Sequence, residues 1–494
     1  MKNKFNEAIC AEGMSNTIIP FSDLQKRYPE YSDANQQLVA QNLEQELAKL
    51  KMKIVVLDDD PTGTQTVNDI HVYTQWDKDC LKDAFDQTAS MFYVLTNSRS
   101  FSQEQTKAVH KEIAQHLLEI SNESGKDFIV ISRSDSTLRG YYPLEPETLK
   151  NTMESHSSKI FDGEIICPFF VEGGRYTVDN IHYVKEGKYL TPAGETEFAR
   201  DKSFGYKNSN LPMWIEEKSE GKYPASEVEC ITLDMLRGLK YGEIEDILRK
   251  ADGYKKIVVN AVSYWDIKVF ITAFVRAILS GKRFIFRSAA AIPKVIGGVP
   301  DVPLLGKDDL IDNGNANGGL IIIGSHVNKT TLQFEKLREL DNIIFFEFNQ
   351  HLVHEPEKMA SHAVQVRDAV DSAISKGKTT VVYTRRERVD APSGSQEDNL
   401  RMATSISDTI SGMVNQLHAR PSFVIAKGGI TSSDIAVKGL GVKKAMIAGQ
   451  ILKGIPVWLT GNDSKFPKIP YVVFPGNVGE VDALKEIVAN LQER

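Results

Sequence analysis

The chain has 494 residues, of which 41% are hydrophobic and 25% charged, and its formal net charge is -7. This length exceeds what one hydrophobic core usually supports, so we expect two or three domains. The negative charge argues against nucleic-acid binding as the main function. The sequence contains neither an apolar run of membrane-spanning length nor a secretory signal, and its four cysteines lack metal-binding or disulfide spacing. We therefore expect a cytoplasmic protein without nucleic-acid or membrane partners.

The first half of the chain alternates short apolar runs with helical patterns. Residues 1–50 hold one amphipathic pattern near 34–50 and no identifiable chemistry, and we treat them as an N-terminal extension. Near-continuous apolar runs then predict strands buried on both faces of a parallel sheet, at residues 53–58, 91–96, 128–132 and 164–168. This alternation predicts a doubly wound α/β domain over residues 51–300. The stretch 173–226, rich in Gly, Pro, Tyr and charge, interrupts it and predicts hairpins and a long excursion.

The second half repeats the pattern after a linker. Residues 297–319 are dense in Gly, Pro, Asn and Asp, which favours a connection between domains. Apolar runs then predict further strands at residues 320–325, 343–348, 379–384 and 423–429. We expect a second domain over residues 318–494. The chain would then form two doubly wound α/β domains with an active-site cleft between them.

Three consecutive carboxylates follow the first predicted strand, in IVVLDDDPTGTQTV (residues 54–67). Like charges a few ångströms apart disfavour one another unless a cation, hydrogen-bond donors or a shared proton compensates. A solvated acidic loop is one explanation, but the apolar strand before the triplet and the small residues after it favour a site. The turn resembles the motif of haloacid-dehalogenase-like phosphatases, with Asp58 as nucleophile and Asp60 as acid and base. That alternative lacks a convincing late acidic magnesium motif and leaves the glycine-rich C-terminal half unexplained.

A second polar segment is SRSDSTLRGYYPLEPE, residues 132–147. It follows a predicted strand and would form a loop at the carboxyl end of a parallel sheet, where such sheets bind ligands. Its polar residues are Arg133, Asp135, Ser136, Thr137 and Arg139. Arginines beside hydroxyls and an Asp suit a small polyhydroxylated carboxylate, because Arg binds carboxylates bidentately. A capped helix start with solvated arginines is an equally open alternative.

Three glycine-rich turns follow predicted strands in the C-terminal half. They lie in IIIGSHVNKTTLQ (321–333), VIAKGGITSSDIAVKGLG (424–441) and VVFPGNVGEVDAL (472–484). Glycines let backbone N–H groups approach phosphate oxygens, and the helix N-termini favour negative charge. One such turn is more often a tight strand–helix connection, but three in one domain predict phosphate binding. Lys427 would add a positive charge for the phosphates, or would be an ordinary surface lysine. None of the turns matches the Walker or Rossmann fingerprint.

In combination these motifs resemble the four-carbon acid sugar kinase family. The resemblance runs in order from about residue 53 to the C-terminus and is specific through the set of motifs rather than through any one of them. The matching segments are Asp59–Gly63, Asp135–Gly140, Gly174–Thr177, Thr196–Glu197, Gly324–Ser325, Gly428–Thr431 and Gly476–Gly479. The chain departs from the family pattern at Asp58, Pro61 and Thr64-Gln65 in the first turn, and at Phe474-Pro475 in place of a Lys before the last turn. The N-terminal extension and the polar insertion near 203–226 are also unusual, and together these departures bear on the substrate more than on the reaction.

The resemblance implies an ATP-dependent kinase that phosphorylates the terminal hydroxyl of a C4 sugar acid such as threonate, erythronate or 3-oxo-tetronate. It implies a sugar-acid site in the N-terminal domain and an ATP site in the C-terminal domain, with Mg²⁺ accompanying ATP. We also allow for a homodimer. For the sugar acid we expect Thr62, Gly63, Arg99, Asp135, Ser136, Arg139 and Arg175, and for the nucleotide Ser325, Gly428, Gly429, Ile430, Thr431 and Gly476.

Phosphoryl transfer also needs a group that orients the attacking hydroxyl. We expect Asp59 or Asp60 to accept the proton of that hydroxyl, while Arg139 and Arg99 hold the carboxylate. The metal ligands stay open at this stage. Asp434 is a weak candidate, because a carboxylate in the first turn of a helix more often stabilises the helix dipole.

Overall fold

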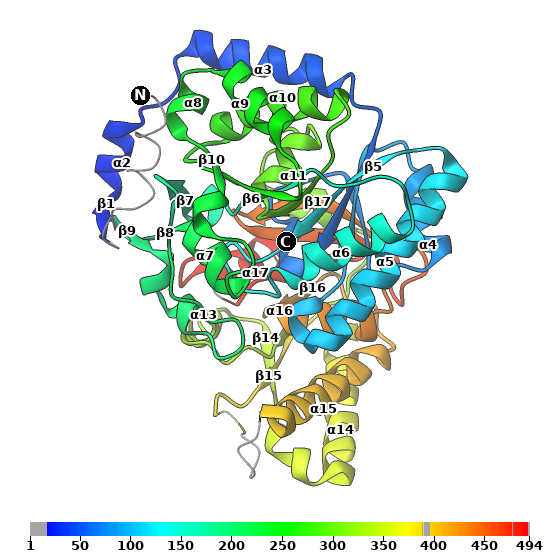
Figure 1. Ribbon diagram of the computed structural model, residues 1–494. Coiled ribbons are helices and arrows are strands. Elements are labelled where there is room, and N and C mark those ends of the chain that lie inside the picture. The colour runs from blue at the N-terminus through cyan, green and yellow to red at the C-terminus, as the bar shows by residue number, and fades with distance from the viewer. Residues whose placement is uncertain (1–16, 388, 390–395, 477, 493–494) are drawn as a thin grey trace. The chain divides into compact units, whose positions relative to one another are not determined.

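The computed structural model describes residues 17–387, 389, 396–476 and 478–492. The chain forms two compact units, both of α/β type, as predicted (Figure 1). The first unit comprises Met1–Asp59, Trp76–Phe92 and Ser98–Val299, and the second comprises Asp60–Gln75, Tyr93–Asn97 and Pro300–Arg494. The division falls between the second and third carboxylates of the acidic turn.

The first unit contains a parallel sheet with the strand order β10-β11-β6-β12-β5-β2. The strands are β2 (Lys53–Asp58), β5 (Phe128–Arg133), β6 (Gly163–Cys167), β10 (Glu229–Ile231), β11 (Lys255–Val259) and β12 (Phe284–Ser288). Apart from the edge strand β10 and the first residue of β11, every residue of these strands is buried. Strands that are buried on both faces require helices on each side, which explains their near-continuous apolar sequences.

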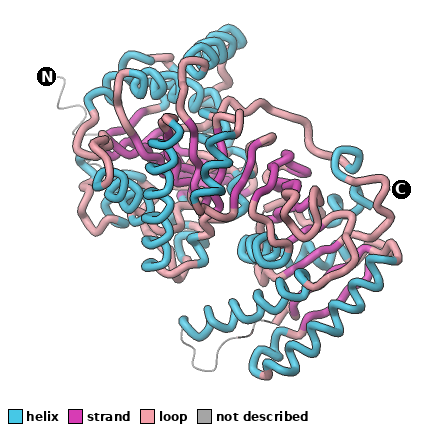
Figure 2. The backbone as a smooth tube through the Cα atoms, turned by 90° about the vertical axis from the view of Figure 1, so that its right-hand side faces the viewer, coloured by secondary structure: helices cyan, strands magenta, loops and turns pink. Residues whose placement is uncertain are grey.

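Helices cover this sheet (Figure 2). The helices of the first unit are α2 (Phe21–Arg27), α3 (Asp33–Leu47), α4 (Lys78–Asp86), α5 (Gln103–Ser124), α6 (Leu144–Ser155), α7 (Leu211–Lys218), α8 (Leu233–Arg237), α9 (Tyr241–Lys250), α10 (Tyr264–Leu279) and α11 (Ala291–Ile296). Helices α3 and α9 both pack against α10 (Figure 1). The hydroxyl of Tyr31 donates to Asp266 at 2.9 Å, so the described part of the N-terminal extension belongs to this unit.

The polar excursion at residues 173–226 forms a small antiparallel sheet. Its strand order is β1-β9-β8-β7, with β1 (Ile19–Pro20), β7 (Arg175–Val178), β8 (Ile181–Glu186) and β9 (Tyr189–Pro192). The expected hairpins are therefore present. The helix α7 was not predicted; its Trp214 is fully buried and stacks on Tyr142 with ring centroids 4.5 Å apart.

The second unit has the strand order β3-β17-β18-β19-β16-β13-β15-β14. The bounds are β3 (Ile70–Tyr73), β13 (Leu320–Ile323), β14 (Ile343–Phe348), β15 (Thr379–Thr384), β16 (Val424–Lys427), β17 (Lys444–Leu452), β18 (Ile455–Thr460) and β19 (Pro470–Phe474); β4 (Met91–Leu95) has residues in both units. The strands from β19 to β14 are parallel, whereas β17 and β18 form an antiparallel hairpin with Gly454 at φ +79° in its turn.

The helices of the second unit include the two long neighbours α14 and α15 (Figure 1). The α-helices of this unit are α12 (Lys307–Leu310), α13 (Asn328–Leu337), α14 (Pro356–Ser375), α15 (Gln396–Asn415), α16 (Gly429–Asp434) and α17 (Ala483–Gln492). The short 3-10 helix η1 (Pro61–Thr64) also belongs to this unit. Helices α13 and α17 pack together over a buried core that includes Phe334 and Leu484. Within the described ranges, each helix is too short or too polar to span a bilayer.

Candidate active site

The acidic turn begins at the carboxyl end of β2, directly beside the end of β5. Asp58 and Arg133 are paired residues of these two parallel strands. Asp58 is fully buried, and its Oδ1 lies 3.0 Å from Nη1 of Arg133. We expected Arg133 to lie in the loop, but it is the last residue of β5. A buried carboxylate held by an arginine in this way is part of the framework of the site.

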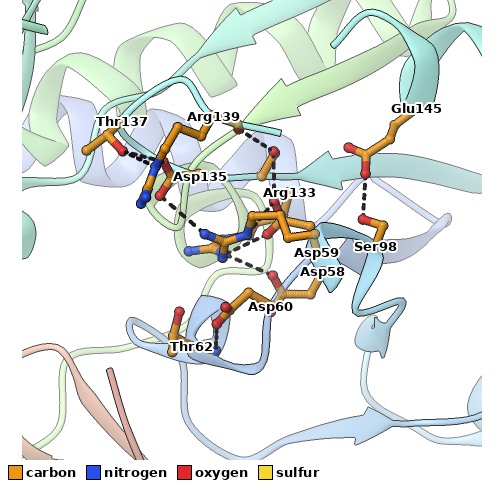
Figure 3. A network of polar contacts seen from close by, with 12 residues as sticks. Asp58, Asp59, Asp60, Thr62, Ser98, Arg133, Asp135, Thr137, Arg139 and Glu145 are labelled. Atoms are coloured by element: carbon orange, nitrogen blue, oxygen red, sulfur yellow. Dashed lines mark hydrogen bonds and ion pairs between the residues drawn. The ribbon is translucent and has the colours of Figure 1, made fainter. Parts of the chain in front are cut away.

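Asp59 lies among hydrogen-bond donors and positive charges (Figure 3). Its Oδ2 lies 3.1 Å from Nε of Arg99 and accepts a hydrogen bond from Oγ of Ser134 at 2.9 Å. Its Oδ1 lies 3.4 Å from Nη1 of Arg133. Opposite charges and hydrogen bonds to the ionised form stabilise a carboxylate. The repulsion between Asp58 and Asp59 is therefore offset by arginines from two neighbouring elements.

The loop after β5 forms a second ion-pair group (Figure 3). Asp135 accepts from Nε of Arg139 at 2.8 Å and from the hydroxyl of Thr137, and it lies 3.6 Å from Nη1 of Arg99. Burial alone would raise the pKa of Asp135, but the two guanidinium groups hold it well below its usual range. Arg99 thus contacts both Asp59 and Asp135. These contacts bring together residues that are 36 to 76 positions apart in the sequence.

Arg175 reaches the same group through an aromatic ring. The guanidinium groups of Arg139 and Arg175 lie 5.1 and 5.4 Å from the ring centroid of Phe198. Arg175 donates to the carbonyl oxygen of Gly173, and its Nε is a buried atom without a hydrogen-bond partner in the described part of the chain. Burial lowers the pKa of Arg175, and the field of Asp135 opposes that shift. Arg175, in the hairpin of β7 and β8, is therefore close to the loop of residues 134–140 that follows β5, which we call the polar loop. Its positive charge would be available there to an acidic ligand.

Three buried side chains form hydrogen bonds with backbone carbonyl oxygens of the polar loop. His182, on β8, hydrogen-bonds through Nε2 to the carbonyl oxygen of Ser136 at 2.7 Å, and burial lowers its pKa to about 3. The hydroxyl of Tyr206 donates to the carbonyl oxygen of Thr137 at 2.6 Å. Nη2 of Arg287, the fourth residue of β12, donates to the carbonyl oxygens of Asp135 and Arg139 at 3.1 and 3.2 Å. The excursion at residues 173–226 therefore positions the loop.

Positive charge exceeds negative charge in this group. Its cations are Arg99, Arg133, Arg139, Arg175 and Arg287, and the carboxylates that contact them are Asp58, Asp59, Asp135 and, 3.5 Å from Arg139, Asp201. Glu145 adds little negative charge, because burial and the charge of Asp59 raise its pKa to about 8. Nε and Nη1 of Arg287 are buried without a partner among the described residues. A surplus of guanidinium charge suits a small anion.

The three glycine turns converge in the second unit. Ile323 pairs with Lys427 and Lys427 with Phe474, so β13, β16 and β19 end at the same level. The hydroxyl of Thr330 donates to the carbonyl oxygen of Gly476 at 3.1 Å, and its oxygen lies 3.3 Å from Oγ of Ser325. The predicted nucleotide residues from the three turns thus lie together.

Side chains at these glycine positions would crowd the neighbouring turns. A Cβ atom at Gly324 would overlap the hydroxyl of Thr431, and one at Gly428 would lie 3.0 Å from Cβ of Ser325. Gly428 also has φ +120°, which side-chain-bearing residues rarely adopt. A Cβ at Gly476 would lie 3.3 Å from Oγ of Ser325. Such close backbone approach fits a cradle for phosphate groups.

Lys427 does not lie on the surface. Its side chain is fully buried, and Nζ donates to the carbonyl oxygen of Pro475 at 2.5 Å. Nζ also lies 3.8 Å from the ring centroid of Phe474. Burial lowers its pKa to about 6, with a smaller contribution from Lys329. Lys427 therefore ties the second turn to the third and is largely neutral at pH 7.

Asp60, the third carboxylate of the acidic turn, lies beside the glycine turns of the second unit, which we call the nucleotide group. A Cβ atom at Gly429 would overlap Oδ2 of Asp60, and η1 packs against α16. Oδ1 of Asp60 accepts from the backbone N–H of Thr62 at 2.8 Å (Figure 3). Thr62 and Gly63, which we assigned to the sugar acid, are residues of η1 and lie in the second unit with Asp60. Ile430 is 58% exposed at the same turn.

A metal site is not evident from clustered ligands. Among the residues that the structure describes, no group of three or more His, Cys, Asp or Glu side chains is placed to hold a metal ion. Asp434 lies 3.0 Å from Nζ of Lys438 and accepts from the hydroxyl of Ser407. These partners give Asp434 a structural role on α16. A magnesium ion bound mainly through nucleotide oxygens and water would need few protein ligands.

Sequence reasoning missed several residues of both groups. Arg287 lies in the apolar strand FIFRS. Arg386, whose Nη2 donates to the carbonyl oxygen of Ser325 at 2.6 Å, follows the strand TTVVYT, so neither arginine belongs to a polar motif. A single arginine at the end of a predicted buried strand was the available signal. His182 and Glu145 gave none, because their partners are contributed by elements distant in sequence.

The comparisons with known proteins agree with this division. A sugar-binding N-terminal domain matches residues 54–296, and a nucleotide-binding C-terminal domain matches residues 320–484. No curated protein sequence gives a significant match. A crystal structure of the Haemophilus influenzae protein HI1011 is 17% identical, covers 88% of this chain and 100% of its own, and has a TM-score of 0.56.

A second solved structure shows the same fold. It is a Salmonella typhimurium LT2 protein described provisionally as a tRNA synthase, 15% identical, with 88% of this chain and 98% of its own covered and a TM-score of 0.60. A sugar-binding domain followed by a nucleotide-binding domain does not favour the phosphatase alternative, which uses no nucleotide. The matched domains, the motifs and the shared fold together show that the chain belongs to the four-carbon acid sugar kinase family.

Proposed function

We propose that the chain is an ATP-dependent kinase that phosphorylates the terminal hydroxyl of a four-carbon sugar acid such as threonate, erythronate or 3-oxo-tetronate. The observation that carries this proposal is the separation of the polar residues into two groups of different chemistry. One is rich in arginine and lies in the sugar-binding unit, and the other is built from glycine turns in the nucleotide-binding unit. A kinase needs both kinds of site.

The arginine-rich group supports a sugar acid as the acceptor. In this proposal Arg139 and Arg99 hold the carboxylate, and Arg175 adds charge from the neighbouring hairpin. Asp135 and Ser136 hydrogen-bond to the sugar hydroxyls. The ion pairs from Arg139 and Arg99 to Asp135 orient the guanidinium groups before the acid binds, which reduces the entropy lost on binding.

The glycine turns support a nucleotide as the phosphoryl donor. Ser325, Gly428, Gly429, Thr431 and Gly476 would hold the polyphosphate of ATP, with backbone N–H groups and hydroxyls as donors. The crowding at Gly324 and Gly428 shows why a side chain is excluded there. ATP would supply the phosphoryl group, and a bound Mg²⁺ would neutralise part of its charge.

The two carboxylates Asp59 and Asp60 have different surroundings, which separates their roles. Asp59 is held by Arg99, Arg133 and Ser134, which fix the orientation of its carboxylate. Asp60 lies against Gly429 of the nucleotide turn. We propose that Asp60 accepts the proton of the attacking hydroxyl. The oxygen of that hydroxyl then forms the new bond to phosphorus, while the bond between phosphorus and the leaving phosphate oxygen breaks. Asp59 would position the acceptor.

The test is an ADP-release assay on the full chain with a panel of C4 and C5 sugar acids, with and without Mg²⁺. The proposal predicts release that depends on both a C4 acid and the metal. Release without any acid, or phosphate release from phosphoesters in the absence of nucleotide, would overturn it. The same panel would identify the acid that is used.

A further inference from the structure

The nucleotide group requires positive charge that the glycine turns alone do not supply. A polyphosphate carries several negative charges, and backbone N–H groups provide only partial ones. Lys427 was the sequence candidate for this charge, but its Nζ is buried and donates to the carbonyl oxygens of Pro475 and Gly476. This inference rests on the proposed function and asks which other cation of the second unit serves the site.

Arg386 is positioned at the nucleotide turns. It follows β15, which pairs with β13, the strand that leads into Ser325. Nη2 of Arg386 donates to the carbonyl oxygen of Ser325 at 2.6 Å and to the hydroxyl of Thr331 at 3.0 Å. Its Nε also donates to that hydroxyl at 3.3 Å. One guanidinium group therefore fixes the first glycine turn to the start of α13.

Part of this guanidinium group lacks a partner. Nη1 of Arg386 is buried and has no hydrogen-bond partner among the residues that the structure describes. Burial lowers the pKa of Arg386, and the charge of Glu335 opposes that shift. An arginine stays protonated at neutral pH in spite of such a shift. The guanidinium group thus donates to two neutral oxygens, and among the residues that the structure describes no carboxylate forms an ion pair with it.

The preceding residue provides a natural comparison. Arg385 carries the same charge, but its Nε pairs with Glu347 at 2.7 Å and its side chain is 43% exposed. An exposed ion pair of this kind contributes little and leaves no net charge for a ligand. The two adjacent arginines therefore differ in whether their charge is neutralised and in whether they touch the glycine turns.

We propose that Arg386 is a positioning residue of the nucleotide site, which orients the Ser325 turn and directs uncompensated positive charge at the polyphosphate. Its effect should grow with the number of phosphates on the nucleotide. A purely structural role would weaken the binding of all adenine nucleotides by the same factor.

The test is calorimetric titration of the full chain with ADP and with AMP. We compare the original sequence with Arg386→Gln, Arg386→Lys and the control Arg385→Gln. Removing a hydrogen bond from a charged group usually weakens binding about 10- to 100-fold. We expect a loss of that size for ADP with Arg386→Gln, a smaller loss for AMP, partial recovery with Arg386→Lys, and unchanged binding with Arg385→Gln.

Two outcomes would overturn the inference. One is ADP binding by Arg386→Gln at the original strength, and the other is an equal loss for ADP and AMP. Thermal unfolding of each variant shows whether it is folded, and Arg386→Lys serves as the test variant if Arg386→Gln is not. Absence of ADP binding by the original sequence would instead overturn the proposed function, so the two failures are distinguishable.

Discussion

Asp60 and Gly429 are in direct contact: a Cβ atom at position 429 would overlap Oδ2 of Asp60. The contact joins the acidic turn to the second glycine turn inside one unit, with η1 packed against α16. Thr64, in the same 3-10 helix, accepts a hydrogen bond from Nε1 of the buried Trp458 at 2.9 Å. The position of Asp60 is therefore fixed by the core of the nucleotide-binding unit.

Substitution of Asp60 or Gly429 should reduce turnover more than it reduces ADP binding. Asp60→Asn keeps the shape of the side chain but removes the proton acceptor, and loss of a general base typically lowers the rate about 10²- to 10⁴-fold. Gly429→Ala should lower the rate as well, because the new methyl group displaces Asp60. Steady-state kinetics with calorimetric ADP binding would measure both effects. Unchanged turnover in Asp60→Asn would rule out its assigned role.

Asp135→Asn should impair use of the sugar acid and leave the nucleotide unaffected. The change removes the charge that orients Arg139 and Arg99. We expect KM for the acid to rise by about tenfold or more, with ADP affinity unchanged. The exposed Asp252→Asn, in the same unit, serves as the control. A matching loss of ADP affinity would show that the variant is damaged more widely.

The buried carboxyl of Glu145 should make stability depend on pH. Its pKa is raised from 4.5 to about 8 by burial and by the charge of Asp59, while Ser98 donates to it at 2.5 Å. Between these values the native chain holds a proton that the unfolded chain has lost, so the free energy of unfolding falls as pH rises. Glu145→Gln should flatten this slope in urea unfolding between about pH 5 and 8.

The neighbouring Glu147 gives the matched control. It lies on the same helix, but Lys222 and Tyr223 outweigh its burial and lower its pKa. It is therefore ionised in both states across that window, and Glu147→Gln should leave the slope intact. Parallel slopes for the original sequence and Glu145→Gln would contradict the prediction.

Lys427→Met should weaken ADP binding although the side chain is buried and remote from solvent. Nζ holds the carbonyl oxygens of Pro475 and Gly476, and methionine keeps the length but removes the donors. Because the pKa of Lys427 is about 6, the native chain binds fewer protons than the unfolded chain above pH 6. Stability should therefore rise with pH through the neutral range, and Lys427→Met should reduce that rise. The exposed Lys453→Met is the control for both measurements.

The strand pattern was predictable because burial on both faces leaves a direct trace in the sequence. The run at residues 53–58 is β2, and the run at 379–384 is β15. The antiparallel hairpin of β17 and β18 was not predicted. The strand β17 alternates half-buried and buried residues, but its sequence KAMIAGQIL places apolar residues at both kinds of position.

Other features depend on contacts between distant segments and leave no local trace. Nothing in the acidic turn shows that Asp59 and Asp60 belong to different units. Arg287 reads as one residue of a buried strand, but its guanidinium group lies 5.4 Å from the ring centroid of Trp214 and donates to carbonyl oxygens of the loop after β5. The composition of the polar excursion, likewise, does not show that it supports that loop.

Identifying the product tests the central claim most directly. The full chain would be incubated with ATP, Mg²⁺ and the preferred sugar acid, and the product examined by phosphorus and carbon NMR. The account predicts a phosphate ester on the terminal carbon of the acid, formed in a one-to-one ratio with ADP. Free inorganic phosphate as the sole phosphorus product, or an ester on another position, would contradict it.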